Sequence, residues 1–541
     1  MSNLQRRSIQ GHSIRWNEDL ARTAYQEGHW VKSTLADTLQ RAAREEPERI
    51  LVVDGNTRLS AAELHGQAQQ MAGVLAARYA PGSVVTFMLP NWHEAAVIYM
   101  AATLAGMVAH PVLPSLRAHD LRFMLQDVDS RMIFIPQVHR GHACAEMLQQ
   151  VTADMARPPE VVVVRGDGEL HTPYEALFGG AEPAPLPQQE PDAVRMIMYT
   201  SGTTGRPKGV MHSHNSIHAL IRQLGEHWLA EPGDSFLVAS PISHIGGSIY
   251  AFECPLLLGT TAVLMEQWNP DEAVQLLLEQ RCTHFAGATP FLTQTLASAR
   301  AAGTRLPDLK LFICGGASVP PSLIREAADY FERAIVTRVY GSTEVPVTTV
   351  GALAADDLLH AATTDGKPGI ADVLLVDAQG KTANHGEVLA RGPQMLVGYV
   401  HAEDEAPAFD RQGYYRSGDI GDWIDGDYLV ISGRLKDIII RNGENIAPKE
   451  VEDLLLQHPD IAEIAIVGLP HPKTGERACA VIVPSSGAQP GVDDLRHFLG
   501  ARGVAKFKNP EQVELWQALP KNDAGKVLKQ KIRETLLARK S

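Results

Sequence analysis

Short apolar runs and longer stretches of helical periodicity alternate along the chain. Runs rich in β-branched residues occupy positions 84–89, 132–135 and 161–164, and each has the length and uniform apolarity of a strand buried on both faces. Between such runs, stretches such as 61–79 repeat apolar residues with the period of an amphipathic helix. This alternation predicts an α/β fold of layered sheets and helices.

Local signals mark where some elements begin and where the chain connects them. Asn269 followed by Pro270 predicts the start of a helix, because asparagine caps a helix N-terminus and proline fits its first position. Residues 181–192 contain four prolines and no periodicity, which indicates a connection between two subdomains.

The pattern changes near Gly433, beyond which we expect a small separate domain. Pro448 opens a helix with one apolar face, and strand-like runs follow at 464–469 and 478–483. The prediction is a large N-terminal domain over residues 1–432 made of layered α/β subdomains, a connecting segment at 433–437, and a small C-terminal α+β domain over 438–541.

Composition narrows the class of protein further. The 541 residues include 63 acidic and 49 basic ones, for a net charge of −14. A general nucleic-acid or anionic-membrane binder needs a basic face, so neither is expected. The five cysteines are widely spaced and form no CxxC pair, which is typical of a reducing compartment rather than of a disulfide framework or a zinc site.

No segment predicts export or a membrane span. The N-terminus lacks an apolar core of the kind a secretory signal needs, and the final residues are not a peroxisomal address. The longest apolar run, 95–108, is shorter than the about 20 residues of a spanning helix, so we interpret it as a buried helix. The expected location is the cytoplasm.

A loop rich in glycine and hydroxyl side chains follows the strand expected at 196–199. Its backbone N–H groups and hydroxyls could surround phosphate oxygens while Lys208 balances their charge. The spacing is not that of P-loop NTPases, and as bare composition such a loop is more often a plain turn. The candidate phosphate-binding residues are Thr200, Ser201, Gly202, Thr203, Thr204, Gly205 and Lys208.

The string TSGTTGRPKGV closely resembles the phosphate loop of the adenylate-forming superfamily, which comprises acyl-CoA synthetases, luciferases and the adenylation domains of peptide synthetases. The family's other signatures follow in the expected order over about 330 residues, ending at Lys526. The resemblance implies ATP, Mg²⁺ and CoA as cofactors, and a small C-terminal domain that is mobile.

The string YGSTE at 340–344 resembles the family's second nucleotide motif. The resemblance implies that Tyr340 lies against adenine with Gly341 beside it, that Thr343 contacts phosphate, and that Glu344 holds the metal. One carboxylate suits Mg²⁺, which keeps several waters and takes few protein ligands. Without the family, this string would be an ordinary turn after the strand expected at 334–339.

Two further motifs resemble the ribose-binding and hinge segments of the family. In YRSGD, Asp419 would accept from the ribose hydroxyls with Arg434 assisting, although alone Asp419 would be interpreted as a turn residue. In the segment from Gly433 to Ile446, the resemblance makes Lys436 the hinge about which the small domain rotates. Gly443 would line the tunnel for the pantetheine thiol.

The string PKNDAGK at 520–526 resembles the family's C-terminal catalytic loop. The resemblance makes Lys526 the residue that neutralises charge on the carboxylate and phosphate oxygens during adenylation. Without the family, Lys526 would be a solvated surface lysine. Acylation of this lysine would remove its charge, which leaves open a regulatory modification.

Small and apolar residues match the family's acyl pocket. His244 would gate access to the carboxylate, although a lone histidine is more often structural. The other candidate pocket residues are Gly287, Gly315, Gly316 and Ala317. Because the segment after His244 has no carboxylate before Glu253, a substrate ammonium would lack a partner, so we expect a neutral, hydrophobic acid rather than an amino acid.

The expected acceptor of the acyl group is free CoA. Residues 506–508 resemble a stretch that contacts the CoA nucleotide in aryl-CoA ligases, so Phe507 could stack on the CoA adenine while Lys508 and Arg441 meet its phosphates. The alternative is that these side chains merely cover the small domain. The predicted activity is therefore an ATP-dependent acyl-CoA synthetase. A stand-alone enzyme that loads a carrier protein, a non-catalytic nucleotide-binding regulator and a luciferase-like oxygenase are the alternatives, and a homodimer is left open.

Overall fold

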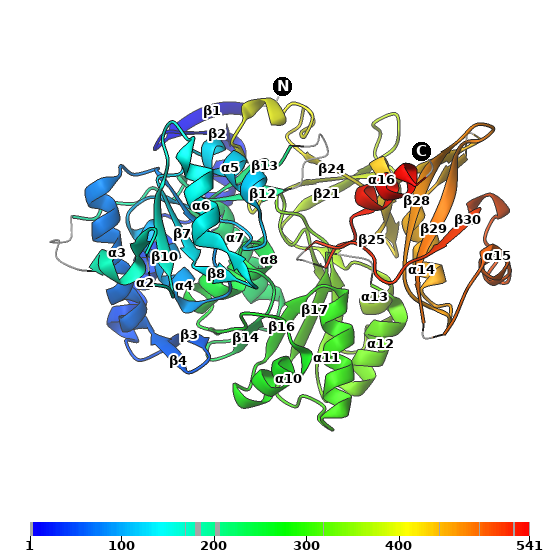
Figure 1. The fold of residues 1–541 in the computed structure, drawn as a ribbon, viewed down its shortest axis with the longest axis horizontal. Helices are drawn as coiled ribbons and strands as arrows, with labels where there is room; N and C mark the ends of the chain where they lie inside the picture. Colours follow the sequence, from blue (N-terminus) through cyan, green and yellow to red (C-terminus); the bar gives the residue numbers. More distant parts are fainter. Residues whose placement is uncertain are drawn as a thin grey trace.

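A computed structural model describes residues 4–167, 169–178, 185–200, 206–316, 319–442, 444–485, 487–522 and 525–539. The chain forms a large N-terminal domain and a smaller C-terminal one, which stand side by side in Figure 1. Both mix helices and strands, so the expected α/β class and its two-domain form are confirmed.

The first sheet of the large domain has eight strands, in the order β11-β10-β7-β5-β6-β12-β13-β23. Strands β11 to β12 run parallel to their neighbours, whereas β13 and β23 are antiparallel additions at one edge. The strands are β5 (Val84–Phe87), β6 (Val108–Pro111), β7 (Met132–Pro136), β10 (Glu160–Val164), β11 (Thr172–Pro173), β12 (Val194–Thr200), β13 (Lys208–Ser213) and β23 (Gly398–Tyr399).

The second sheet has seven strands, in the order β18-β17-β16-β14-β15-β3-β4. All its pairs are parallel except β3 with β4. The strands are β3 (Ile50–Asp54), β4 (Thr57–Ser60), β14 (Ser235–Val238), β15 (Thr261–Leu264), β16 (His284–Gly287), β17 (Leu311–Gly315) and β18 (Ile335–Val339).

Helices cover both faces of each of these two sheets, which fits the mostly apolar sequences of the strands. In β10, Val162 and Val164 belong to the core shared by the two sheets, while Val161 and Val163 face the opposite side. The shared core contains α2 (Leu35–Glu45), α3 (Ala61–Arg78), α4 (His93–Leu104) and α7 (His214–His227). The outer layers are α5 (Ala118–Asp127) and α6 (Cys144–Ala153) on one sheet, and α10 (Pro270–Glu279), α11 (Thr289–Ala301) and α12 (Pro321–Tyr330) on the other.

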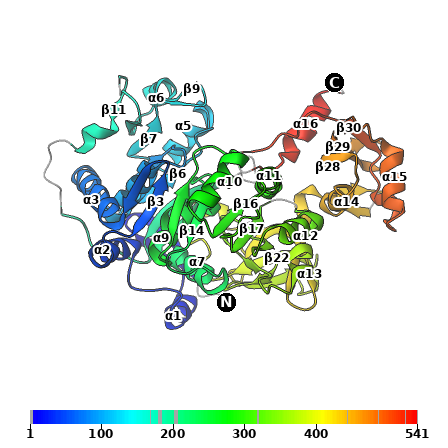
Figure 2. The ribbon, with the colours of Figure 1, turned by 90° about the horizontal axis from the view of Figure 1, so that it is seen from below.

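Figure 2 shows α2 and α3 on one side of the second sheet and α10, α11 and α12 on the other. Asn269 caps α10 with its side chain on the amides of Asp271 and Glu272, and Pro270 is the first helical residue, as predicted. Burial of both faces explains the continuous apolar strands, since each side chain meets a helix whichever way it points.

The longest apolar run is a buried helix that ends earlier than expected. Helix α4 stops at Leu104, and Val108 already begins β6. Every residue of α4 from Ala95 to Leu104 is buried. In the part of the chain that the structure describes, no helix combines the length and the apolarity needed to cross a membrane.

The proline-rich segment does not separate two subdomains, contrary to the expectation from its composition. Strands β10 and β11 precede it and β12 follows it, and all three belong to the same eight-stranded sheet. The described part, 185–192, has no helix or strand. Prolines indicate an irregular crossing, but which elements it joins depends on strand pairing that local composition does not record.

A four-stranded antiparallel sheet lies between the two larger sheets and the small domain in Figure 1. Its order is β21-β22-β24-β25, with bounds Asp372–Val376, His385–Arg391, Tyr415–Ile424 and Tyr428–Arg434. After β25 comes a 3₁₀ turn, η4 (Leu435–Asp437), and then the first strand of the small domain, β26 (Ile439–Arg441).

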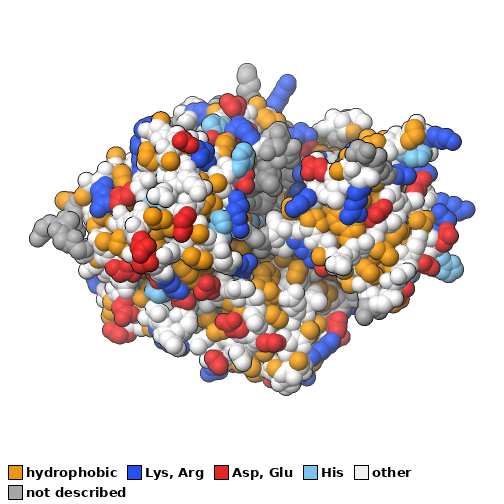
Figure 3. All heavy atoms as spheres, in the orientation of Figure 1, with side chains coloured by type: hydrophobic (Ala, Val, Ile, Leu, Met, Phe, Trp, Pro, Cys, Tyr) orange, Lys and Arg blue, Asp and Glu red, His pale blue; other side chains and the backbone are white. Residues whose placement is uncertain are grey.

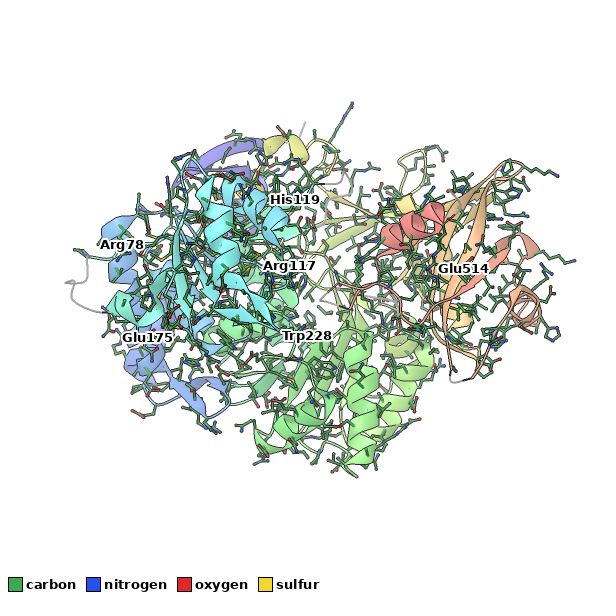
Figure 4. All side chains as sticks on the ribbon, in the orientation of Figure 1. Arg78, Arg117, His119, Glu175, Trp228 and Glu514 are labelled. Atoms are coloured by element: carbon green, nitrogen blue, oxygen red, sulfur yellow. The ribbon has the colours of Figure 1, made fainter. Side chains whose placement is uncertain are left out.

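The small domain is one mixed sheet with helices on both faces. Its strands are β26, β27 (Glu444–Ile446), β28 (Ile461–His471), β29 (Gly475–Pro484) and β30 (Gln512–Leu515). Along β28, Ile464 and Ile466 pack with α14 (Pro448–Leu455) and α15 (Val492–Gly500), whereas Ala465 and Val467 pack with α16 (Lys529–Ala538). Figure 4 labels Glu514 on β30, and Trp228, a fully buried residue of the large domain.

Candidate nucleotide and acyl site

The candidate motifs meet at one edge of the second sheet. Strands β14, β16, β17 and β18 are neighbours and parallel, so their carboxyl ends lie together. The segment leading to His244 follows β14, Gly287 ends β16, Gly315 ends β17, and Tyr340 follows β18. In open parallel sheets this edge is where ligands bind.

The phosphate loop connects the ends of β12 and β13 in the other sheet. Its central residues, Ser201, Gly202, Thr203, Thr204 and Gly205, lie outside the described residues. Both flanks are described: Thr200 ends β12 and the buried Lys208 begins β13.

Asp404 holds the two basic residues that end this loop. Its carboxylate accepts from Arg206 at 3.0 Å, and its other oxygen lies 3.6 Å from Lys208 Nζ. The side chains of Asp404 and Lys208 are each only 10% exposed. Glu403 also pairs with Arg206, at 3.1 Å, but is 77% exposed. Asp404 therefore makes the sheltered contacts to the loop.

Glu344, the expected metal ligand, is a buried carboxylate surrounded by hydroxyl groups. Tyr399 donates its hydroxyl to Glu344 at 3.1 Å, and the Thr200 hydroxyl lies 3.5 Å away. Burial and the nearby carboxylate raise the pKa of the Tyr399 hydroxyl, so it stays protonated and donates. Among the described residues no lysine or arginine forms an ion pair with Glu344. An oxygen-rich set without a cationic partner fits a hard divalent ion such as Mg²⁺.

The backbone around Thr343 and Glu344 is held from two sides. Leu396 donates its N–H to the carbonyl of Glu344 at 2.7 Å, and His212 Nε2 lies 2.7 Å from the carbonyl of Thr343. Burial lowers the pKa of His212 to about 4, so the ring is neutral. Gly341 must be glycine here, because a Cβ would lie 2.6 Å from the backbone nitrogen of Val347.

Tyr340, Asp419 and Arg434 form one connected group. The Tyr340 hydroxyl donates to Asp419 at 2.7 Å, and Arg434 Nε pairs with the other carboxylate oxygen at 2.7 Å. Asp419 is buried, at 4% exposed. The register that places Asp419 opposite Arg434 in adjacent strands β24 and β25 explains why these two motifs meet.

Lys526 reaches this group from the small domain. Its loop is tight, since the Asn522 side chain accepts from the Lys526 N–H at 2.8 Å, while Asp523 and Ala524 lie outside the described residues. A Cβ on Gly525 would be 3.6 Å from Pro290, so the loop contacts the edge of the large domain.

The position of Lys526 changes its acidity. Desolvation, together with Arg434 and Lys436, lowers its pKa to about 8 from an ordinary value of 10.5, and Asp419 opposes this shift. The side chain is exposed, but it lies near enough to Arg434 and Asp419 of the large domain for their charges to act on it. Figure 3 shows a depression between the domains with Lys and Arg side chains on both sides.

The candidate acyl-pocket glycines differ in the space they leave. A Cβ on Gly287 would lie 2.7 Å from the ring of Phe291, and one on Gly315 would lie 2.9 Å from the carbonyl of Val339. Gly316 has open space beside it but a φ of +80°, which strains any other residue. His244 precedes a short helix, α8 (Ile245–Ser248), and Ala317 lies outside the described residues.

The candidate CoA residues lie on the small domain and already have partners. Arg441 makes two contacts of 2.8 Å to Glu511, and Lys508 contacts Glu450 at 2.6 Å. Phe507 packs against the core beside α14 and α15. Phosphates would therefore compete with carboxylates here. Gly443 lies outside the described residues.

Asp404, Tyr399 and His212 escaped the sequence analysis. Their partners are 198, 55 and 131 positions away along the chain, at Arg206, Glu344 and Thr343 respectively. No local pattern marks them. Asp404 follows Gly398 and Tyr399 closely in the sequence, but an acidic residue after such a pair is too common to indicate a site.

Comparison with known proteins agrees with this geometry. The family model described as AMP-binding enzyme matches residues 39–400, and that of the AMP-binding enzyme C-terminal domain matches 450–526. The chain therefore belongs to the AMP-binding enzyme family, in the acyl-CoA synthetase branch of the adenylate-forming superfamily.

Relatives and solved structures extend over nearly the whole chain. The chain is 32% identical over 539 residues to a medium-chain fatty-acid–CoA ligase of Escherichia coli strain K12, covering 97% of this chain and 94% of that one. It is 30% identical over 534 residues to a 2,3-dihydroxybenzoate–AMP ligase of Bacillus subtilis strain 168, covering 96% and 97%. The crystal structure of ATP-bound MatB from Rhodopseudomonas palustris superposes with a TM-score of 0.82 at 28% identity, covering 92% and 98%.

The enzyme class follows from the family. The protein is an AMP-forming acid–CoA ligase that uses ATP, Mg²⁺ and CoA.

Proposed function

We propose that the substrate is a neutral, mostly apolar carboxylic acid, which the enzyme converts to an acyl-adenylate and then to a thioester of CoA. The observation that carries this proposal is the state of Glu253, the first carboxylate after His244. It is 1% exposed and pairs with the equally buried Arg195 at 2.7 Å. Each charge neutralises the other, so neither is free to pair with a charged group on the acyl chain.

The residues of the site divide the work of the first half-reaction. Asp419 and Arg434 bind the ribose, Tyr340 lies against adenine, and Lys208 with the phosphate loop holds the outer phosphates. Glu344 would hold Mg²⁺, which supplies charge neutralisation at the phosphates. Lys526 stabilises the charge that builds as the carboxylate oxygen attacks the α-phosphorus and the bond to pyrophosphate breaks.

The second half-reaction needs the small domain to turn. We propose domains over 1–432 and 438–541 with a hinge at 433–437. Strand β25 ends at Arg434 in one sheet and β26 begins at Ile439 in another. The short segment 435–438, which contains η4, is the part of the chain that connects the two sheets. Lys436 is exposed within that turn, and rotation there would withdraw Lys526 and admit the thiol of CoA.

Loading of a carrier protein is the second candidate. The relative named as an AMP ligase, and the carboxylates already paired with Arg441 and Lys508, favour it. In that case the small domain would receive a pantetheine arm without binding the CoA nucleotide.

A screen of pyrophosphate release over carboxylic acids tests the proposed substrate class. Straight-chain, alicyclic and aryl acids should support release, and amino acids should do so far less than the matching des-amino acids. A preference for amino acids would overturn the proposal. Comparing CoA with a pantetheinylated carrier protein as acceptor, using the preferred acid, decides between the two candidates.

A further inference from the structure

His212 connects the strand of the phosphate loop to the second nucleotide motif. It lies in β13, four positions after Lys208, opposite Met196 of β12. The side chain is completely buried. Its Nε2 is 2.7 Å from the carbonyl oxygen of Thr343, and its Nδ1 is 3.2 Å from the hydroxyl oxygen of Ser216.

These two contacts determine how the ring is protonated. A carbonyl oxygen can only accept, so Nε2 must carry the proton and donate to Thr343. In a neutral imidazole Nδ1 is then an acceptor, and the single proton of the Ser216 hydroxyl can go either to it or to the Ser213 carbonyl, each at 3.2 Å. The short Nε2 contact therefore sets the orientation of the ring.

The Thr343 carbonyl is one of two successive anchors. The next carbonyl, that of Glu344, accepts from the N–H of Leu396 at 2.7 Å. Together they fix the backbone from which the hydroxyl of Thr343 and the carboxylate of Glu344 project. Of the two donors only His212 is a side chain, so only that anchor can be removed by substitution.

We propose that His212 is a positioning residue for adenylation, which sets Thr343 and Glu344 in register with Lys208 through its hydrogen bond to the Thr343 carbonyl. The proposal rests on the proposed roles of Thr343 and Glu344 in binding MgATP. His212 is completely buried and its ring nitrogens face Thr343 and Ser216, so we assign it no direct contact with a reactant. Its effect should therefore appear in the use of ATP and not in the later transfer of the acyl group.

Three substitutions separate the hydrogen bond from the ring. His212→Gln can place an amide donor near the position of Nε2, His212→Asn is polar but too short to reach Thr343, and His212→Leu is apolar and of similar bulk. We measure pyrophosphate release against MgATP concentration, thioester formation from chemically synthesised acyl-AMP, and thermal unfolding. The shift in Tm caused by a non-hydrolysable ATP analogue with Mg²⁺ reports binding without any acid.

The expected result is a loss of about tenfold in kcat/KM for ATP, with a smaller Tm shift by the analogue, in the Asn and Leu variants. The Gln variant should stay near wild type, and transfer from acyl-AMP should be unchanged in all three.

Equal losses in all three variants, equal losses in both half-reactions, or no loss at all would each overturn the proposal. Misfolding of the Asn and Leu variants beside an active Gln variant would also overturn it, since the bond would then serve the fold. Failure of the proposed function would look different, because wild-type enzyme would then release no pyrophosphate with any acid.

Discussion

The pKa of Lys526 predicts how kcat/KM for ATP depends on pH, since this constant reports on ionisable groups of the free enzyme. Desolvation and the nearby Arg434 and Lys436 lower that pKa to about 8, and the ammonium form is the one that stabilises the transition state of adenylation. With a pKa of about 8, most of the enzyme carries the charge at pH 7 and only a small part does at pH 9. We expect kcat/KM for ATP to fall about tenfold per pH unit above 8.

Pyrophosphate release at low MgATP, measured from pH 7 to 9.5, checks this expectation. Lys526→Arg should lose the decline, because a guanidinium keeps its charge throughout this range. Lys526→Ala should be nearly inactive in adenylation yet still form thioester from synthetic acyl-AMP. A flat wild-type profile, or the same decline in the Arg variant, would refute the reasoning.

Titration of Lys526 cannot cause the fall in activity by unfolding the protein. The folded-state pKa is lower than the unfolded one, so between about pH 8 and 10.5 the unfolded chain binds more protons. The contribution of this lysine to stability therefore rises with pH while activity falls. Thermal unfolding across the same range provides the control.

Three other parts of the site can be tested by substitution. Asp404→Asn removes the buried partner of Arg206 and Lys208 and should raise the KM for MgATP about tenfold. The control Glu403→Gln removes an exposed partner of Arg206 and should change that KM less than twofold. Equal effects of the two substitutions would show that burial of the carboxylate does not matter. Lys436→Pro should leave pyrophosphate release near normal but impair transfer to CoA, because proline restricts the turn between β25 and β26. A variant that transfers the acyl group to CoA at the normal rate would show that the small domain does not rotate about Lys436. Gly287→Ala should penalise large acids more than propionate, since the methyl would press on Phe291; equal losses in kcat/KM with an intact fold would mean that this residue does not bound the acyl pocket.

The sequence by itself determined the elements whose signals are local. The strand at 161–164, the helix capped by Asn269 and the helix opened by Pro448 all form where the pattern predicts them. Apolar periodicity, caps and proline positions act within a few residues, so they can be seen along the chain. The nucleotide motifs were recognisable only through their resemblance to a family, since by local signals alone the strings at 200–209 and 340–344 would be interpreted as turns.

Only the tertiary structure decided which of these pieces meet. It showed that the proline-rich segment connects strands of one sheet and not two subdomains, because strand order is set by packing and not by the connecting residues. It also brought Asp404 to Lys208 and His212 to Thr343, pairs that no spacing in the sequence announces. The lowered pKa of Lys526 has the same origin, because desolvation and the nearby charges of Arg434 and Lys436 are properties of the folded arrangement and not of the residue.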